Sequence, residues 1–326
     1  MIKFRNCKLA LLLLTFTTVV NGSVLEREDV RLFVQDMVAR HGFNEADLNS
    51  VFEHVEIIDS IIEAISRPAE KKPWYQYRSI FLKSDRIRQG VEFWEANAEP
   101  LARAEAVYGV PAEIIVAIIG VETRYGRDSG RYKVINSLAT LAFDYPKRAA
   151  FFTGELEHFL LMSREQAMDP LSITGSYAGA MGIPQFIASS YRNYAVDFDR
   201  DGVVDIINNK VDAIGSVGNY FKIHGWVAGE PITRPAEISG DGFRQYLTDG
   251  LELDTTTGEL SSHGLAIPDL QGNTEVKLLE FENQDQNEYW LGFRNFYVIT
   301  RYNNSMLYAM VVFQLAREIR SRYTAP

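Results

Sequence analysis

Several residue types and motifs are scarce in this chain, and each shortage excludes a class of chemistry. The 326 residues include one cysteine, Cys7, and five histidines. The histidines are scattered without the His-Glu-x-x-His spacing of a zinc enzyme. There is no Gly-x-Ser-x-Gly nucleophile elbow, no phosphate-binding glycine loop and no dinucleotide fingerprint. Zinc enzymes, serine hydrolases of that type and nucleotide-binding enzymes are therefore poorly supported.

Basic residues are also in short supply. The chain has 33 lysines and arginines against 43 acidic residues, a formal net charge of −10. An acidic protein is repelled by phosphate backbones, which argues against a nucleic-acid partner.

Long apolar runs are missing beyond the first residues. A run of twelve mostly apolar residues, 9–20, follows Lys3, Arg5 and Lys8 and precedes small residues. It is shorter than the roughly 20 residues that a membrane-spanning helix needs. This pattern predicts a signal peptide at residues 1–22 that is cleaved near Ser23. Cys7 precedes the run, so it cannot be the lipid-bearing first residue of a mature lipoprotein. We expect a soluble exported protein without an anchor, cysteine or disulfide.

The most informative residue that is present is Glu122. Residues 111–125 read as a helix, with Pro111 suited to its first position and Gly126 available as a stop signal. Three isoleucines, at positions 115, 118 and 119, precede Glu122 at helical spacing, which places the carboxylate on the buried stripe. Burial raises the pKa of a carboxyl and suits it to donate a proton near neutral pH. The alternative is a structural carboxylate paired with Arg124 or another cation.

The hydrophobic pattern divides the chain into regions. Residues 23–100 form a predicted helical lobe, with Asn44 as an N-cap and an aromatic-rich loop at residues 67–80. Residues 101–230 are again helical and hold most candidate functional residues. Residues 231–295 alternate turn residues with short apolar runs, at 276–281 and 289–293 among them, and predict a small β-rich insertion. Residues 296–326, with a helix at 306–319, complete the central part. The predicted class is mainly α (α+β).

An acidic loop predicts a metal site. Aspartates occupy positions 1, 3, 5 and 9 of residues 197–205, with glycine at position 6, as in the first part of an EF-hand. Position 12 is Asn208 instead of glutamate, so Asp212 is the candidate that closes a lengthened loop. Oxygen ligands favour calcium, in a structural role. The predicted ligands are Asp197, Asp199, Asp201, Val203 through its carbonyl, and Asp212. The alternative is an acidic surface turn.

A stretch of small residues, 176–186, ends in Gln185 and Phe186. Small side chains allow a close approach, an amide can hydrogen-bond acetamido groups, and an aromatic ring can stack on a sugar. The alternative is a tight loop between helices.

Together, the motifs at residues 120–126 and 180–186, the aspartate loop and Arg-Tyr-Asn at 301–303 resemble the membrane-bound lytic murein transglycosylase B family. The resemblance covers roughly residues 65–315. It implies a lysozyme-like core between a helical lobe and a small β-rich lobe, and cleavage of the β-1,4 MurNAc-GlcNAc bond of peptidoglycan. The chain departs from the family name because Cys7 cannot carry a lipid, so a soluble periplasmic member is expected.

The resemblance also implies roles for individual residues. Glu122 matches the single catalytic acid, and Lys147 stands where the family more often has arginine. The residues that match glycan-binding positions are Tyr77, Arg148, Ser176, Met181, Gln185, Phe186, Tyr220, Tyr302, Asn303 and Tyr308.

The implied mechanism uses one carboxyl twice, as acid and then as base, and forms 1,6-anhydroMurNAc without water. It differs from the paired carboxylates of ordinary glycosidases. Two other functions stay open from the sequence: a hydrolytic muramidase on the same fold, and a non-catalytic glycan-binding protein.

Overall fold

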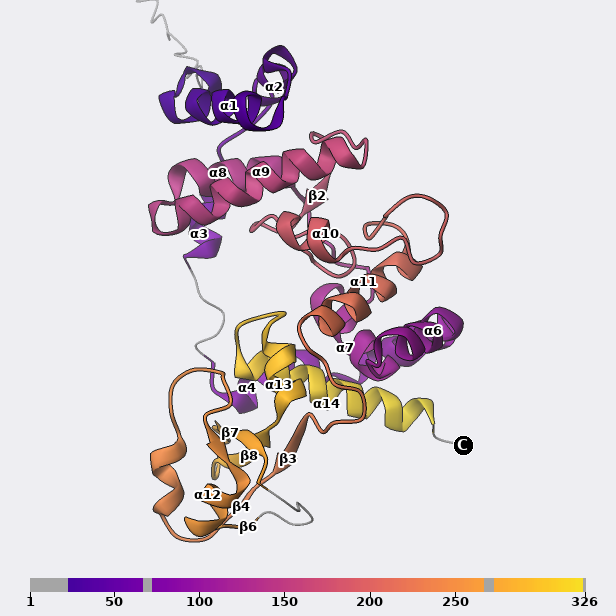
Figure 1. Cartoon of the computed structure of the whole chain (residues 1–326), viewed down its shortest axis with the longest axis vertical. Coiled ribbons are helices and arrows are strands. Elements are labelled where there is room, and N and C mark those ends of the chain that lie inside the picture. Colours follow the sequence, from indigo (N-terminus) through magenta and orange to yellow (C-terminus); the bar gives the residue numbers. More distant parts are fainter. Residues whose placement is uncertain (1–22, 67–71, 267–272, 325–326) are drawn as a thin grey trace, which may run out of the picture. The chain divides into compact units, whose positions relative to one another are not determined.

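The computed structural model describes residues 23–66, 72–266 and 273–324 (Figure 1). They fall into two compact units, one ending at His54 and one beginning at Val55. Helices dominate and the strands are few and short, which confirms the predicted mainly α class with some β structure. The predicted signal peptide, residues 1–22, lies outside the described residues. The predicted domain boundaries stay predictions.

The first unit is a small helical arrangement. Asn44 is the predicted N-cap, and its side-chain oxygen accepts hydrogen bonds from the backbone N–H groups of Ala46 and Asp47 at 2.8 and 3.2 Å. Phe33 and Phe52 pack edge to face, with their ring centroids 5.9 Å apart. The elements of this unit are η1 (Val24–Glu26), α1 (Glu28–His41) and α2 (Glu45–Phe52).

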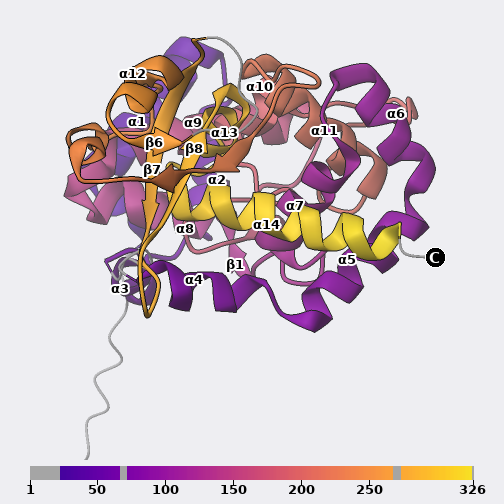
Figure 2. The same cartoon turned by 90° about the horizontal axis from the view of Figure 1, so that it is seen from below.

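The second unit is built around helix α7 (Ala112–Thr123). Three of its isoleucines, Ile115, Ile118 and Ile119, have no exposed surface, because neighbouring helices cover α7 on several sides. Helix α14 runs along α7 and α5 (Figure 2). The other helices of this unit, up to α11, are α3 (Asp59–Ile65), α4 (Trp74–Phe81), α5 (Ser84–Ala96), α6 (Ala98–Tyr108), α8 (Val134–Asp144), η3 (Pro146–Arg148), α9 (Ala149–Glu165), α10 (Ala188–Tyr194) and α11 (Lys210–Ile223).

The ends of α7 differ from the prediction. Pro111 is the N-cap and not the first helical residue, and the helix ends at Thr123. Arg124 and Tyr125 both adopt left-handed backbone conformations, with φ of 48° and 65°. The chain therefore turns before Gly126, which was the predicted stop signal. The turn is held by tertiary contacts of Thr123 and Tyr125 that local sequence signals do not report.

The loop predicted at residues 67–80 is wrong for its second part, while residues 67–71 lie outside the described residues. Trp74–Phe81 forms helix α4. Trp74 is 1% exposed, and its ring lies 5.1 Å from that of Phe281 in the β-rich region. This packing stabilises the helix, since tertiary burial readily overrides weak local propensity.

The β-rich region, residues 231–295, contains most of the strands. The two predicted apolar runs form the antiparallel pair β7 and β8, within a sheet of order β3-β8-β7-β5. One face of this sheet covers a small core that includes Phe243, Leu260 and Leu291. Its elements are β3 (Thr233–Pro235), β4 (Glu237–Ile238), η4 (Gly242–Tyr246), β5 (Thr255–Thr256), α12 (Thr257–Ser262), β6 (Leu265–Ala266), β7 (Glu275–Phe281) and β8 (Glu288–Gly292).

The last helix returns to α7. Helix α14 begins after the N-cap Ser305 and is longer than predicted. In its last turn Tyr323 stacks on Trp94 of α5, with the ring centroids 4.3 Å apart. Among the described residues no single helix is long and apolar enough to cross a membrane, and one pair, α6 with α7, meets the length and composition criteria only as a helix bent by 114°. The remaining elements are α13 (Arg294–Thr300), α14 (Met306–Tyr323), β1 (Tyr132–Lys133) and β2 (Thr174–Gly175).

Candidate active site

Glu122 lies in the last turn of α7 and is half-buried. The hydroxyl of Tyr308, from the first turn of α14, donates a hydrogen bond of 2.5 Å to its Oε1. Burial raises the pKa of Glu122 from 4.5 to about 7, and the hydrogen bond from Tyr308 partly offsets this rise by favouring the charged form. At neutral pH the carboxyl can therefore exist in both protonation states.

The ion pair considered as the alternative for Glu122 is not formed with Arg124. The guanidinium of Arg124 points to Asp128, with 3.7 Å between the closest nitrogen and oxygen. The turn after Thr123 directs Arg124 to the surface, where it is exposed. Arg124 therefore does not lower the pKa of Glu122.

A group of packed aromatic rings extends from Tyr308, the donor to the carboxyl. Tyr302 lies nearly parallel to Tyr308, with the ring centroids 6.5 Å apart. Tyr302 also contacts Phe186 and Tyr220, at centroid distances of 5.9 and 4.8 Å. We call the set that consists of Glu122, Gln185, Phe186, Tyr220, Tyr302 and Tyr308 the Glu122 cluster. Burial raises the pKa of both Tyr302 and Tyr308 well above 10, so these hydroxyls stay protonated and act as hydrogen-bond donors.

The segment 181–186 is fixed against this cluster by its backbone. The Tyr302 hydroxyl donates to the carbonyl of Pro184 at 2.6 Å. Gln185 has a φ of 52° and donates its amide N–H to the carbonyls of Ser129 and Gly182, both at 3.0 Å. Met181 is fully buried and pairs through its backbone with Phe186. The small-residue segment therefore lies directly against Tyr302 of the Glu122 cluster.

The other predicted glycan-binding residues lie further out. Tyr77 on α4 is buried and lies close enough to Tyr308 to raise the pKa of that hydroxyl slightly. The Ser176 hydroxyl accepts backbone hydrogen bonds from Ala178 and Ala180. Arg148 is exposed and stacks on Phe151, and Asn303 is exposed beside the start of α14. Within the described residues, no side-chain hydrogen bond, ion pair or ring contact joins Ser176, Arg148 or Asn303 to the Glu122 cluster.

Two residues that sequence reasoning missed hold Glu122 in place. Thr123 is fully buried, and its hydroxyl donates to the carbonyl of Ile183 at 2.8 Å and accepts the N–H of Gly126 at 3.0 Å. Arg86 donates to the carbonyl of Gly120 at 3.0 Å. The only sequence feature that pointed to a role for Thr123 was its position next to Glu122. No sequence feature indicated a role for Arg86.

Gly120 permits this arrangement. Tyr125 folds back over α7, and a Cβ added at Gly120 would lie 2.6 Å from its hydroxyl oxygen. The Tyr125 hydroxyl then donates to the carbonyl of Arg86 at 2.8 Å. The glycine is therefore required for close packing directly behind the carboxylate.

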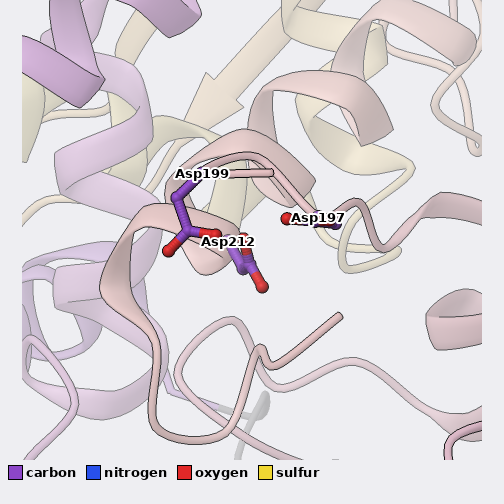
Figure 3. A group of neighbouring side chains, drawn as sticks. All are labelled: Asp197, Asp199 and Asp212. Carbon is purple, nitrogen blue, oxygen red and sulfur yellow. The ribbon is translucent and has the colours of Figure 1, made fainter. Parts of the chain in front are cut away.

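The aspartate loop brings three carboxylates together. Asp197 and Asp199 on the loop and Asp212 in the first turn of α11 turn toward one another (Figure 3), and one oxygen from each lies within 4.8 Å of the others. Asp212 is fully buried and accepts the backbone N–H groups of Phe198 and Asp205, at 2.7 and 2.8 Å. A convergent set of hard oxygen donors fits a calcium ion.

The other aspartates of the loop, the predicted ligand Asp201 and also Asp205, accept local backbone hydrogen bonds. Oδ1 of Asp201 accepts the N–H of Val203 at 2.8 Å, and Asp201 is not one of the three convergent carboxylates. Asp205 accepts the N–H groups of Ile207 and Asn208, both at 2.9 Å. Asp201 and the Val203 carbonyl stay predictions as ligands.

Comparison with known proteins gives a consistent result. The sequence profile described as "Transglycosylase SLT domain" matches residues 26–317. The Escherichia coli (strain K12) protein "Membrane-bound lytic murein transglycosylase B" is 42% identical over 311 residues, which cover 92% of this chain and 85% of that protein.

Solved structures agree with the sequence comparison. Soluble lytic transglycosylase SltB1 from Pseudomonas aeruginosa is 52% identical and superposes with a TM-score of 0.88, over 91% of this chain and 100% of that chain. The E. coli lytic transglycosylase Slt35, solved in complex with calcium, is 42% identical with a TM-score of 0.87, over 93% of this chain and 96% of that chain.

Proposed function

Because this chain belongs to the transglycosylase SLT domain family and is a lytic transglycosylase acting on peptidoglycan, we propose that Glu122 is its single catalytic acid and base. The fold is the lysozyme-like fold of those relatives. The observation that carries the proposal is the raised pKa of Glu122, about 7, together with its hydrogen bond from Tyr308. A general acid works best when its pKa lies close to the working pH.

In the first step the protonated Glu122 gives its proton to the glycosidic oxygen between MurNAc and GlcNAc. As that bond breaks, positive charge develops at C1 of MurNAc. The carbonyl oxygen of the MurNAc N-acetyl group bonds to C1 and neutralises this charge from within the substrate. The leaving sugar departs with the proton, and Glu122 remains as a carboxylate.

In the second step the same carboxylate takes the proton of the MurNAc C6 hydroxyl. The oxygen at C6 attacks C1, the bond from the acetamido oxygen breaks, and 1,6-anhydroMurNAc forms. Glu122 is protonated again and no water is consumed. No second carboxylate of the described residues contributes to the pKa shift of Glu122, which supports one residue in both roles.

The surrounding residues serve this cycle in different ways. The Tyr308 hydroxyl stabilises the carboxylate between the two steps. Tyr302, Tyr220 and Phe186 present apolar surface that excludes water from C1, so that the C6 hydroxyl is the nucleophile. We assign the remaining predicted positions to contacts with the rest of the glycan: Tyr77, Arg148, Ser176, Gln185 and Asn303, with the fully buried Met181 fixing the fold of segment 181–186.

We also propose a structural calcium ion in the aspartate loop. Asp197, Asp199 and Asp212 would hold it, with Asp201 and the carbonyl of Val203 as further ligands. The ion would supply the positive charge that three convergent carboxylates lack, and would fix the loop against α11. The calcium complex of Slt35 supports this assignment.

We propose that the protein is exported, because its substrate, peptidoglycan, lies outside the cytoplasmic membrane. The basic residues and apolar run of residues 1–22 support a cleaved signal peptide and a periplasmic location.

The test is mass analysis of the fragments released from purified sacculi. The wild-type protein should release 1,6-anhydroMurNAc ends. Glu122→Gln keeps the shape of the side chain but cannot titrate, and should lower turnover at least 1,000-fold. Glu318→Gln, at an exposed position of α14, is the matched control and should behave as wild type. Release of reducing ends alone would identify a hydrolytic muramidase, and unaltered turnover by Glu122→Gln would remove Glu122 from the mechanism.

A further inference from the structure

The β-rich region carries a polar pocket that the proposed reaction does not use. It lies between the turn that joins β7 to β8 and the segment that follows β3, and its volume is about 560 Å³. This falls within the range of roughly 300–1,000 Å³ that small-molecule sites occupy. We call it the hairpin pocket. The residues that give it its chemistry are Asn283, Gln286, Asn287, Glu288, Tyr289 and Trp290.

Glu288, which lines this pocket, is held in a fixed orientation. Its Oε1 accepts hydrogen bonds from Nε1 of Trp74 at 2.7 Å and from the amide of Asn283 at 3.0 Å. Its Oε2 accepts Nε1 of Trp290 at 3.2 Å. The guanidinium of Arg78 lies 3.9 Å away and balances part of the charge. One carboxylate therefore orients two indole rings, so the side chains at this pocket are held in place by hydrogen bonds.

The rim of the pocket offers amide groups next to an aromatic ring. Oε1 of Glu280 accepts hydrogen bonds from the Tyr289 hydroxyl at 2.8 Å and from the Asn287 amide at 2.9 Å, so these two side chains are positioned together. Gln286 is exposed, and no hydrogen bond of its amide is recorded among the described residues. Its donor and acceptor are therefore available to a ligand.

This chemistry selects a neutral sugar. Carboxamides and a carboxylate bind hydroxyl and acetamido groups, and aromatic rings bind the apolar face of a pyranose. Glu282 and Asp285, on the same turn, and Glu237, next to the β3 segment, are exposed acids that repel anionic ligands such as the free carboxylates of stem peptides. We propose that the hairpin pocket binds an N-acetylhexosamine unit of a glycan strand, at a site separate from the Glu122 cluster.

Helix α4 connects this pocket to the Glu122 cluster. Trp74 bonds to Glu288, and Tyr77, one turn later on the same helix, lies near Tyr308. A long strand held at both places gains affinity because the second contact is intramolecular. This kinetic expectation rests on the proposed function, because it assumes that the protein cleaves glycan strands. Loss of the pocket should raise KM for long glycan strands and leave the turnover of a short glycan unchanged.

The indole N–H signals of the protein provide a direct readout. There are four tryptophans. Trp290 lines the pocket, Trp74 bonds to Glu288, and Trp94 stacks on Tyr323. Titration of ¹⁵N-labelled Glu122→Gln protein with triacetylchitotriose should shift the Trp290 signal in a saturable way and leave that of Trp94 in place. The Trp290 signal is identified with Trp290→Phe.

Paired variants test whether binding in the hairpin pocket causes the shift of the Trp290 signal. Gln286→Ala with Asn287→Ala should weaken the Trp290 titration at least fivefold and raise KM for sacculi. Gln284→Ala is the matched control, because this exposed carboxamide lies on the same turn outside the pocket, and it should titrate as wild type. An unmoved Trp290 signal, an equal titration by the double variant, or a shift caused by a stem tripeptide instead of the sugar would each overturn the proposal. Failure of the proposed function would show separately, as absence of 1,6-anhydroMurNAc from wild-type digests.

Discussion

The hydroxyl of Tyr308 donates a hydrogen bond of 2.5 Å to Oε1 of Glu122, although 186 positions separate the two residues in the sequence. Helix α7 supplies the acid and helix α14 supplies its donor, and the two helices pack directly against each other. Burial and this single donor act on the carboxyl in opposite directions. The pKa of Glu122 is thus set by tertiary packing, and several predictions depend on that balance.

Replacing Tyr308 by Phe should move the pH profile of the reaction. The hydrogen bond lowers the pKa of Glu122, so its loss should raise that pKa further. Glu122 must be protonated to begin the reaction, so activity falls as the pH rises through this pKa. A hydrogen bond to a charged group contributes about 1.5–3 kcal/mol, equivalent to a shift on the order of one pH unit or more.

The measurement is kcat/KM against pH for wild type and Tyr308→Phe. Tyr302→Phe is the control, since that hydroxyl donates to the Pro184 carbonyl instead. An alkaline limb at the same pH in wild type and Tyr308→Phe would show that Tyr308 does not tune the acid.

The raised pKa also makes a prediction about stability. The pKa of Glu122 is about 7 in the folded protein against 4.5 for an ordinary glutamic acid, so the folded state holds a proton that the unfolded chain releases. The contribution of the protonated Glu122 to the free energy of unfolding is fully present below about pH 4.5, falls as the pH rises, and is lost above about pH 7. Glu122→Gln should therefore be more stable than wild type at pH 8, by up to ~3 kcal/mol, and similar at pH 4. Chemical denaturation at both pH values checks this, and an equal difference at the two values would contradict it.

Thr123 should be needed to hold Glu122 in its catalytic position. Thr123→Val keeps the volume but leaves the Ile183 carbonyl and the Gly126 N–H without their partner. Unsatisfied buried groups cost about 1–3 kcal/mol each, so both the melting temperature and kcat should fall. Thr123→Ser keeps the hydroxyl and should restore both. If Thr123→Ser is as impaired as Thr123→Val, the methyl group matters and the hydrogen bonds do not.

Removal of calcium should lower thermal stability with little effect on the chemical step. Asp197, Asp199 and Asp212 repel one another without a cation, and a ligand at 100 times its Kd contributes about 2.7 kcal/mol to folding. Calorimetry with calcium and with a chelator should show melting temperatures several degrees apart.

Asp199→Asn should reduce this calcium dependence. Asp249→Asn, at an exposed position of the β-rich region, should keep it. Identical melting curves of the wild-type protein with calcium and with the chelator would rule out a structural ion.

Local patterns predicted the elements whose contacts lie close in the sequence. The buried isoleucine stripe of α7, the Asn44 cap and the two long strands of the β-rich region were predicted correctly, because each depends on periodicity or on an adjacent backbone group. Helix α4 was predicted as a loop, because its stability comes from Trp74 packing on Phe281.

The sequence alone determined that Glu122 would sit on an apolar helix face and that aspartates would alternate around a glycine turn, because side-chain spacing along a helix or tight loop follows from backbone geometry. Tertiary structure decided which donor reaches Glu122, how Thr123 and Arg86 secure the end of α7, and which carboxylates converge with Asp212. Those outcomes depend on segments far apart in the chain, and their positions follow from packing of the whole core rather than from any local pattern.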